Sequence, residues 1–138
     1  MKSKSKLLKS RRNSYRTSKN VFISFRYAFS GIKYTFRNSR NFQIQVIFAF
    51  FSLILGSIFQ LNKSDYLILL LTIFSVLILE ILNTSIESLV DLVVKKKFSH
   101  TAKIAKDCSA GVVLLASINS VIIGLYLFIP KIKLLFIN

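Results

Sequence analysis

The sequence E-I-L-N-T-S-I-E-S-L-V-D, residues 80–91, places three carboxylates and one amide inside a long apolar segment. At about 100° per residue of α-helix, Glu80, Asn83, Glu87 and Asp91 fall within an arc of about 80° and share one face. A charged side chain in a membrane helix costs about 2.5 to 3.5 kcal/mol, whereas a Leu, Ile, Phe or Val returns only about 0.3 to 0.6 kcal/mol. An acidic stripe in such a segment therefore indicates a functional site.

The composition indicates a membrane protein with one all-α domain. The 138 residues are 53% hydrophobic and carry a net charge of +15, and the charges are segregated from the apolar runs. One Pro and four Gly leave little material for β-turns, and no run alternates with period two. Cys108 is the only cysteine, which excludes an internal disulfide.

Residues 1–20 form a basic N-terminal arm with eight Lys or Arg and no acidic residue. This composition predicts a disordered segment that is drawn to a negatively charged surface. Nucleic acid would satisfy the same electrostatics. A polybasic arm just before membrane helices is better explained by anionic lipid headgroups, so we expect an anionic membrane surface and no nucleic acid as its partner.

Residues 21–37 predict an amphipathic helix that lies in the membrane interface. Apolar residues recur at intervals of three and four, and polar or basic residues fall opposite them. The apolar face is Phe22, Phe25, Phe29, Ile32 and Phe36, and the polar face is Arg26, Ser30, Lys33 and Arg37. Such a helix suits the headgroup plane rather than the bilayer core. The polar residues 38–41 then offer caps for the next helix.

Three apolar runs predict membrane spans at about 42–60, 66–94 and 103–129, within a membrane domain of residues 21–138. Residues 61–65 form a tight polar connection, Gly56 provides a close-packing position, and Pro130 is expected to close the third span. A helix over 66–94 is about 43 Å long, whereas the hydrocarbon core is about 30 Å thick. Its last turns should therefore emerge from the core.

The distribution of Lys and Arg predicts the orientation of the chain. Twelve precede the first span, one lies in the first loop, five lie around the second loop and two follow the third span. The N-terminus and second loop are therefore expected in the cytoplasm. Glu80 would then lie about 9 Å below the cytoplasmic edge of the core, within reach of a lipid hydroxyl, with Glu87 and Asp91 at headgroup level or in the cytoplasm.

An acidic stripe with cations opposite it at a membrane interface suits magnesium-assisted phosphoryl transfer. One carboxylate can accept a proton from a hydroxyl nucleophile, others can hold the metal ion that bridges the phosphates, and lysines can neutralise developing charge. None of the four glycines stands in a Walker A loop. A nucleotide would therefore be held mainly by side chains.

Two motifs carry a resemblance to a known family. They are E-x-x-N-T-x-I-E-x-x-V-D over residues 80–91 and A-K-I-A-K-D-x-x-A-G-x-V-L-L over residues 102–115. Together they resemble the small prokaryotic membrane kinases of diacylglycerol and undecaprenol. The runs S-F-R-Y-A-F-S-G-I-K-Y and N-S-R-N-F-Q-I-Q are similar to the family's surface helix and the entry to its first span. The likeness extends over about residues 22–127.

The resemblance implies an ATP-dependent lipid kinase that uses Mg²⁺ and acts on a lipid alcohol in a bacterial plasma membrane. It implies that Glu80 is the catalytic base, that Asn83 belongs to the same motif, and that Glu87 is a metal ligand. The remaining nucleotide-binding positions that it implies are Tyr27, Asp91, Lys106 and Asp107. It also implies a homotrimer with shared active sites, which would shield the acids from lipid.

Ser39 departs from the family pattern. The sequence has N-S-R-N-F at residues 38–42, where the family usually has N-E-x-x-F with a second metal-binding glutamate. Serine is a much weaker metal ligand than glutamate. Another carboxylate, Asp91 or Asp107, or a water could compensate. We expect reduced but real activity and a gain in turnover from Ser39→Glu.

Three alternatives remain at this stage. Glu80 and Glu87 could be structural acids paired with basic residues of neighbouring helices, although intramembrane acids are functional by default. A proton or cation transporter also needs intramembrane acids, but the outer half of the second span offers only Thr72 and Ser75 as a polar route. A weak or silent family member that acts as a membrane scaffold or adaptor is the stronger alternative, because of Ser39 and the basic arm.

Overall fold

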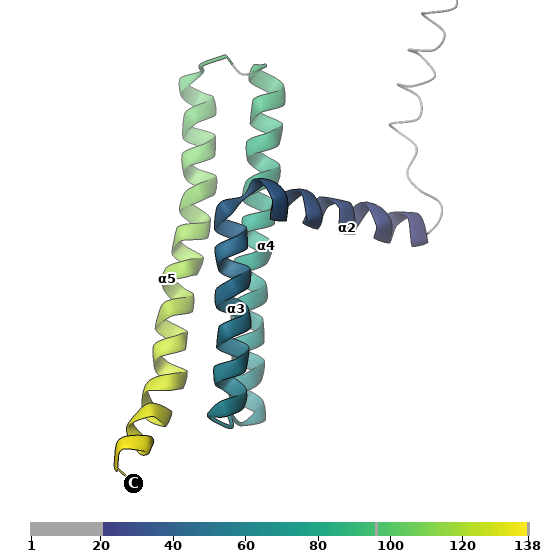
Figure 1. Cartoon of the computed structure of the whole chain (residues 1–138). Helices are drawn as coiled ribbons and strands as arrows, with labels where there is room; N and C mark the ends of the chain where they lie inside the picture. The colour runs from purple at the N-terminus through teal and green to yellow at the C-terminus, as the bar shows by residue number, and fades with distance from the viewer. Residues whose placement is uncertain (1–20, 96, 138) are drawn as a thin grey trace, which may run out of the picture. The chain divides into compact units, whose positions relative to one another are not determined.

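The structure, a computed structural model, describes residues 21–95 and 97–137 (Figure 1). The predicted disordered arm, residues 1–20, lies outside the described residues. The described chain consists of four helices, α2 (Val21–Asn38), α3 (Arg40–Ile58), α4 (Lys63–Val94) and α5 (His100–Ile137), and has no strand. The predicted all-α fold is therefore confirmed. The described residues fall into two units, one that ends at Tyr34 and one that begins at Thr35, and each is considered by itself.

Helix α2 is amphipathic, as the sequence predicts. Its phenylalanines at positions 22, 25 and 29 are largely exposed, and Arg37 lies in its last turn, where a cation complements the helix dipole. Tyr27, the residue predicted to approach the nucleotide, lies on this helix and is 65% exposed. It belongs to the first unit, whereas the other predicted site residues belong to the second.

Capping side chains set where α3 and α4 begin. Ser39 is the N-cap of α3 and accepts a hydrogen bond from the Phe42 amide, which confirms that the 38–41 segment caps this helix. Asn62 is the N-cap of α4 and accepts from the Asp65 amide. Because Asn62 caps the helix, α4 begins at Lys63 rather than at the predicted Tyr66.

In the second unit, α4 packs against both α3 and α5. The buried apolar side chains, which come from all three helices, are Phe42, Leu69, Val76, Val113 and Leu127. Gly56 confirms the predicted close-packing position, because a Cβ atom there would lie 3.3 to 3.4 Å from side chains of Leu61, Leu69 and Tyr66. α3, α4 and α5 are each long and apolar enough to cross a membrane.

Helix α5 does not end at Pro130. It continues through the proline to Ile137, so Pro130 does not end the helix, and its place at the end of the membrane span stays a prediction. Proline removes one backbone donor and clashes with the preceding turn. In an apolar medium, leaving the helix would expose several unpaired backbone groups, which makes continuation the less costly solution.

Candidate functional site

Glu80 is the most buried large side chain among the described residues, with 1% of its surface exposed. Two neutral donors from the start of α3 bind its carboxylate. The Ser39 hydroxyl donates to Oε1 at 2.6 Å, and the Gln45 amide nitrogen donates to Oε2 at 3.3 Å. The carboxylate is therefore enclosed by residues of its own chain.

Ser39 combines two functions in one side chain. As the N-cap it accepts from the Phe42 amide at 3.1 Å, and its hydroxyl proton points to Glu80. A hydroxyl has one proton to donate and two lone pairs to accept with, so both bonds can form together. The same residue therefore begins α3 and connects α3 to the acid on α4.

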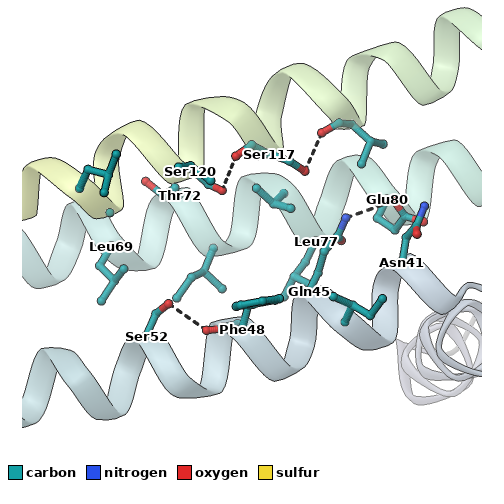
Figure 2. A pocket seen from close by; sticks show the side chains of 18 of the residues that line it. Asn41, Gln45, Phe48, Ser52, Leu69, Thr72, Leu77, Glu80, Ser117 and Ser120 are labelled. Carbon is teal, nitrogen blue, oxygen red and sulfur yellow. Dashed lines mark hydrogen bonds between the residues drawn. The ribbon is translucent and has the colours of Figure 1, made fainter. Parts of the chain in front are cut away.

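An apolar groove of about 720 Å³ leads away from Glu80 between α3, α4 and α5 (Figure 2). Glu80, Gln45 and Asn41 lie together at one end, and Ser52 and Leu69 lie further along it. On α5 the lining residues extend from Ala110 to Ile132, about 33 Å of helix. The hydroxyls of Ser52 and of Thr72, Ser117 and Ser120 in the groove donate to backbone carbonyls of their own helices. The groove therefore offers an apolar path with a carboxylate at one end.

One turn further along α4, Asn83 connects two elements of the site. Its amide nitrogen donates to Glu87 Oε1 at 3.2 Å, and its carbonyl oxygen accepts from the Ser109 hydroxyl of α5. Asn83 and Ser109 are buried, whereas Glu87 is half-buried. Asn83 thus holds α4 to α5 and fixes the position of one Glu87 carboxylate oxygen.

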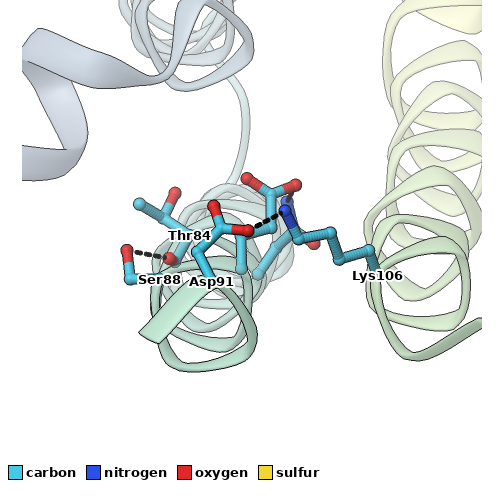
Figure 3. Close-up of polar contacts among 6 residues, drawn as sticks. Thr84, Ser88, Asp91 and Lys106 are labelled. Carbon is cyan, nitrogen blue, oxygen red and sulfur yellow. Dashed lines mark hydrogen bonds and ion pairs between the residues drawn. The ribbon is translucent and has the colours of Figure 1, made fainter. Parts of the chain in front are cut away.

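Asp91 and Lys106 form an ion pair between α4 and α5, with Nζ and Oδ1 2.6 Å apart (Figure 3). Asp91 is 44% exposed and Lys106 is 35% exposed, so both side chains remain accessible to water. Asp107, next to Lys106, is exposed. This end of the helix pair therefore presents both signs of charge to solvent.

The structure brings most of the predicted residues to one face of α4. Glu80, Asn83, Glu87 and Asp91 follow one another along it, and Lys106 reaches Asp91 from α5. Tyr27, in the other structural unit, is not placed relative to them, so its contact with a nucleotide stays a prediction.

The acids suit a magnesium ion that arrives with phosphates rather than one held by a protein cage. Among the described residues, no group of three or more His, Cys, Asp or Glu side chains could hold a metal ion. Magnesium is commonly bound by one or two carboxylates together with substrate phosphates and water. Glu87 is half-buried and can supply one such carboxylate, whereas Asp91 is already paired with Lys106.

Sequence reasoning missed two residues of the site, Gln45 and Ser109. Gln45 is a polar residue within the apolar run of the first span, and such a residue is itself a signal of a site. Ser109 stands directly after the K-D-C run and looks like a small packing residue. Their partners lie 35 and 26 residues away in the chain, so only the packing of the helices reveals them.

Comparison with known proteins gives consistent results. Residues 26–128 match the family described as prokaryotic diacylglycerol kinase. The chain is 43% identical over 120 residues to a diacylglycerol kinase of Synechocystis sp., covering 87% of this chain and 69% of that protein. It is also 43% identical over 110 residues to an undecaprenol kinase of Bacillus subtilis, covering 80% of this chain and 89% of that protein.

Proposed function

Since this chain belongs to the prokaryotic diacylglycerol kinase family and is an integral membrane lipid kinase with ATP as its phosphate donor, we propose that Glu80 is the base that activates the lipid hydroxyl. The observation that carries this proposal is the buried carboxylate at the end of an apolar groove. A lipid chain in the groove would bring its hydroxyl to Glu80. We propose this lipid, and not another helix, as the occupant of the end of the groove beside Glu80.

The reaction balances with Glu80 as proton acceptor. The lipid hydroxyl gives its proton to the Glu80 carboxylate, and its oxygen forms a bond to the terminal phosphorus of ATP. The bond between that phosphorus and the bridging oxygen breaks, and ADP leaves with the electron pair. The products are the lipid phosphate, ADP and one proton, which Glu80 releases afterwards.

Glu87 is the residue we propose as the protein ligand of magnesium, with Asn83 orienting its carboxylate through the 3.2 Å hydrogen bond. Magnesium, when bound with ATP, neutralises charge on the phosphate oxygens. The Ser39 hydroxyl is directed to Glu80 by its hydrogen bond, so we do not assign Ser39 as a second metal ligand. We therefore assign the metal to the half-buried end of the site, at Glu87.

Lys106, Asp91, Asp107 and Tyr27 are the residues that we propose for nucleotide binding. Lys106 carries the charge that phosphate oxygens require, and it is accessible in its pair with Asp91. ATP would draw Lys106 away from Asp91, which leaves Asp91 able to accept from other donors of the nucleotide. Asp107 is exposed beside Lys106 and Tyr27 is exposed on α2, so both are available to a ligand.

The lipid substrate is a diacylglycerol or a polyprenol such as undecaprenol. Each presents one hydroxyl at the interface above apolar chains, which suits a groove that is mostly apolar and has amides of Asn41 and Gln45 at one end. Relatives of both names are equally identical to this chain, at 43%. Activity should therefore be measured with both lipids.

The proposed setting is a bacterial plasma membrane with the N-terminus in the cytoplasm and the basic arm on anionic headgroups, as the Lys and Arg distribution favours. We also propose a homotrimer. Its support is the resemblance to the prokaryotic membrane kinases, which implies active sites shared between chains. Shielding of Glu80 does not require a neighbour, because its own chain already buries it. No observation favours the silent scaffold over the kinase.

The test is transfer of radiolabelled phosphate from ATP to each lipid by the full chain in bilayer discs with magnesium. We expect transfer to at least one lipid and its loss in Glu80→Gln. Asp65→Asn, at the opposite end of α4, is the matched control and should retain activity. Equal transfer by wild type and Glu80→Gln would contradict the proposed base.

A further inference from the structure

Among the residues that the structure describes, no cation is a hydrogen-bond partner of the Glu80 carboxylate. Its two donors are the Ser39 hydroxyl at 2.6 Å and the Gln45 amide at 3.3 Å, one on each carboxylate oxygen. The described ion pair of α4 lies elsewhere, between Asp91 and Lys106. Neutral donors fix the direction of the carboxylate while leaving further lone pairs on both oxygens for a substrate.

The side-chain amide of Gln45 has a second unusual feature. Its carbonyl oxygen is buried and has no hydrogen-bond partner among the described residues. An ionised carboxylate only accepts hydrogen bonds, so the amide must turn its nitrogen to Glu80 and its oxygen away. A buried acceptor without a donor is unfavourable, and each such group calls for an explanation.

Gln45 lies in the wall of the groove at the end where Glu80 is found (Figure 2). A ligand hydroxyl that displaced the groups covering this oxygen would supply the missing donor. A lipid alcohol has one hydroxyl group, and its hydrogen bond can switch from one acceptor to a second acceptor nearby. The carbonyl of Gln45 can therefore receive the hydroxyl before the Glu80 carboxylate removes its proton.

We propose that Ser39 and Gln45 form a neutral clamp on Glu80, and that the carbonyl oxygen of Gln45 is the docking acceptor for the lipid hydroxyl. Ser39 is then a positioning residue that acts through Glu80. Gln45 both positions Glu80 and contacts the substrate. This proposal rests on the proposed role of Glu80 as the base, and it deepens that role by assigning residues of this chain to lipid recognition.

The kinetic constants separate the two parts of the clamp. Ser39→Gly retains most of the capping preference but has no hydroxyl, so we expect kcat about tenfold lower with unchanged KM for lipid and ATP. Ser39→Thr restores a hydroxyl and should recover kcat. Gln45→Met keeps the length of the side chain without its amide, and we expect a lower kcat and a lipid KM about tenfold higher, with the ATP KM unchanged.

The matched control is Gln43→Met, two residues from Gln45 on the same helix. Gln43 donates to the Phe36 carbonyl and not to Glu80, so its loss should leave kcat and lipid KM near wild type. Thermal unfolding and ATP binding of every variant verify that the protein is intact. If Ser39→Gly and Gln45→Met behave like the control while Glu80→Gln is inactive, the clamp is wrong and the proposed base stands. An active Glu80→Gln would remove the base, and the clamp with it.

Ser39→Glu provides a second, independent test. The family pattern leads us to expect a gain in turnover from this variant, and the clamp reverses that expectation. A glutamate here replaces a donor to Glu80 by a second carboxylate, so the clamp predicts a kcat below wild type at every magnesium concentration. If position 39 acts through a metal ion instead, the same variant gains turnover as magnesium is raised. That gain would overturn the role assigned to Ser39.

Discussion

Glu80 and Asp91 lie on the same face of α4, about 16 Å apart along the helix, and are held in opposite ways. Glu80 is 1% exposed and accepts from a hydroxyl and an amide, whereas Asp91 is 44% exposed and pairs with a lysine. A buried carboxylate without a cation is suited to accept a proton from an apolar substrate. A wet ion pair is suited to exchange partners with phosphates. In the function proposed above, α4 therefore serves the lipid near its middle and the nucleotide near its C-terminal end.

The largest expected effect distinguishes the two acids by rate. General-base catalysis contributes about 10² to 10⁴ to a rate, and we expect kcat to fall by that range in Glu80→Gln. Asp91→Asn should lower kcat by much less, because Asp91 lies away from the lipid groove. Initial rates at saturating ATP and lipid measure both. Similar losses in the two variants would mean that Glu80 and Asp91 do not have the different roles proposed for them.

Lys106→Met should act on the nucleotide alone. A hydrogen bond to a charged group is worth about 1.5 to 3 kcal/mol, so we expect the ATP KM to rise about 10- to 100-fold. The lipid KM should stay unchanged, because the groove lining does not include Lys106. Lys63→Met, at the other end of α4, is the control for loss of one positive charge. If Lys106→Met raised the lipid KM and Lys63→Met did not, the proposed separation of the lipid site from the nucleotide site would be wrong.

Much of the fold was predictable from the sequence, since periodicity and composition predict three apolar helices and one acidic face. The four predicted polar residues lie on one helix, as predicted. They are Glu80, Asn83, Glu87 and Asp91. Local rules failed at Pro130, where the helix continues because backbone groups in an apolar medium need internal partners. The predicted first residue of α4, Tyr66, was also too far along the chain, because Asn62 caps the helix and α4 begins at Lys63.

The hydrogen bonds that differentiate Glu80 from Asp91 were not predictable. Ser39 is a recognisable helix cap, but its hydroxyl reaches Glu80 only because α3 begins beside the middle of α4. Gln45 and Ser109 meet their partners through the register of packed helices, which no local pattern specifies. Asp91 and Lys106 were both expected in the site, but their pairing was not.

A smaller effect is expected on the free energy of unfolding when the hydrogen bond to the buried Asn83 is removed. Ser109→Ala removes the donor to the buried carbonyl of Asn83, and we expect a loss of about 1 to 3 kcal/mol in the free energy of unfolding. Ser85→Ala is the matched control, because that exposed serine bonds only its own helix. Thermal unfolding in identical bilayer discs compares them. Equal shifts in Tm would show that the Asn83 bond adds no stability.

The smallest effect is expected for the exposed ion pair. An ion pair that is more than one-third exposed contributes at most about 1 kcal/mol, so Asp91→Asn should scarcely change the Tm. Salt should reduce even this contribution. If Asp91→Asn lost as much stability as Ser109→Ala, the contrast between the exposed Asp91 pair and the buried Asn83 bond would be wrong.

The proposed separation of the lipid site from the nucleotide site is tested most directly by equilibrium binding of ATP, without turnover, to Glu80→Gln and Lys106→Met in bilayer discs with magnesium. We predict that Glu80→Gln, although inactive, binds ATP as tightly as wild type, and that Lys106→Met binds about 10- to 100-fold more weakly. Loss of ATP binding in Glu80→Gln, or wild-type binding in Lys106→Met, would contradict the account.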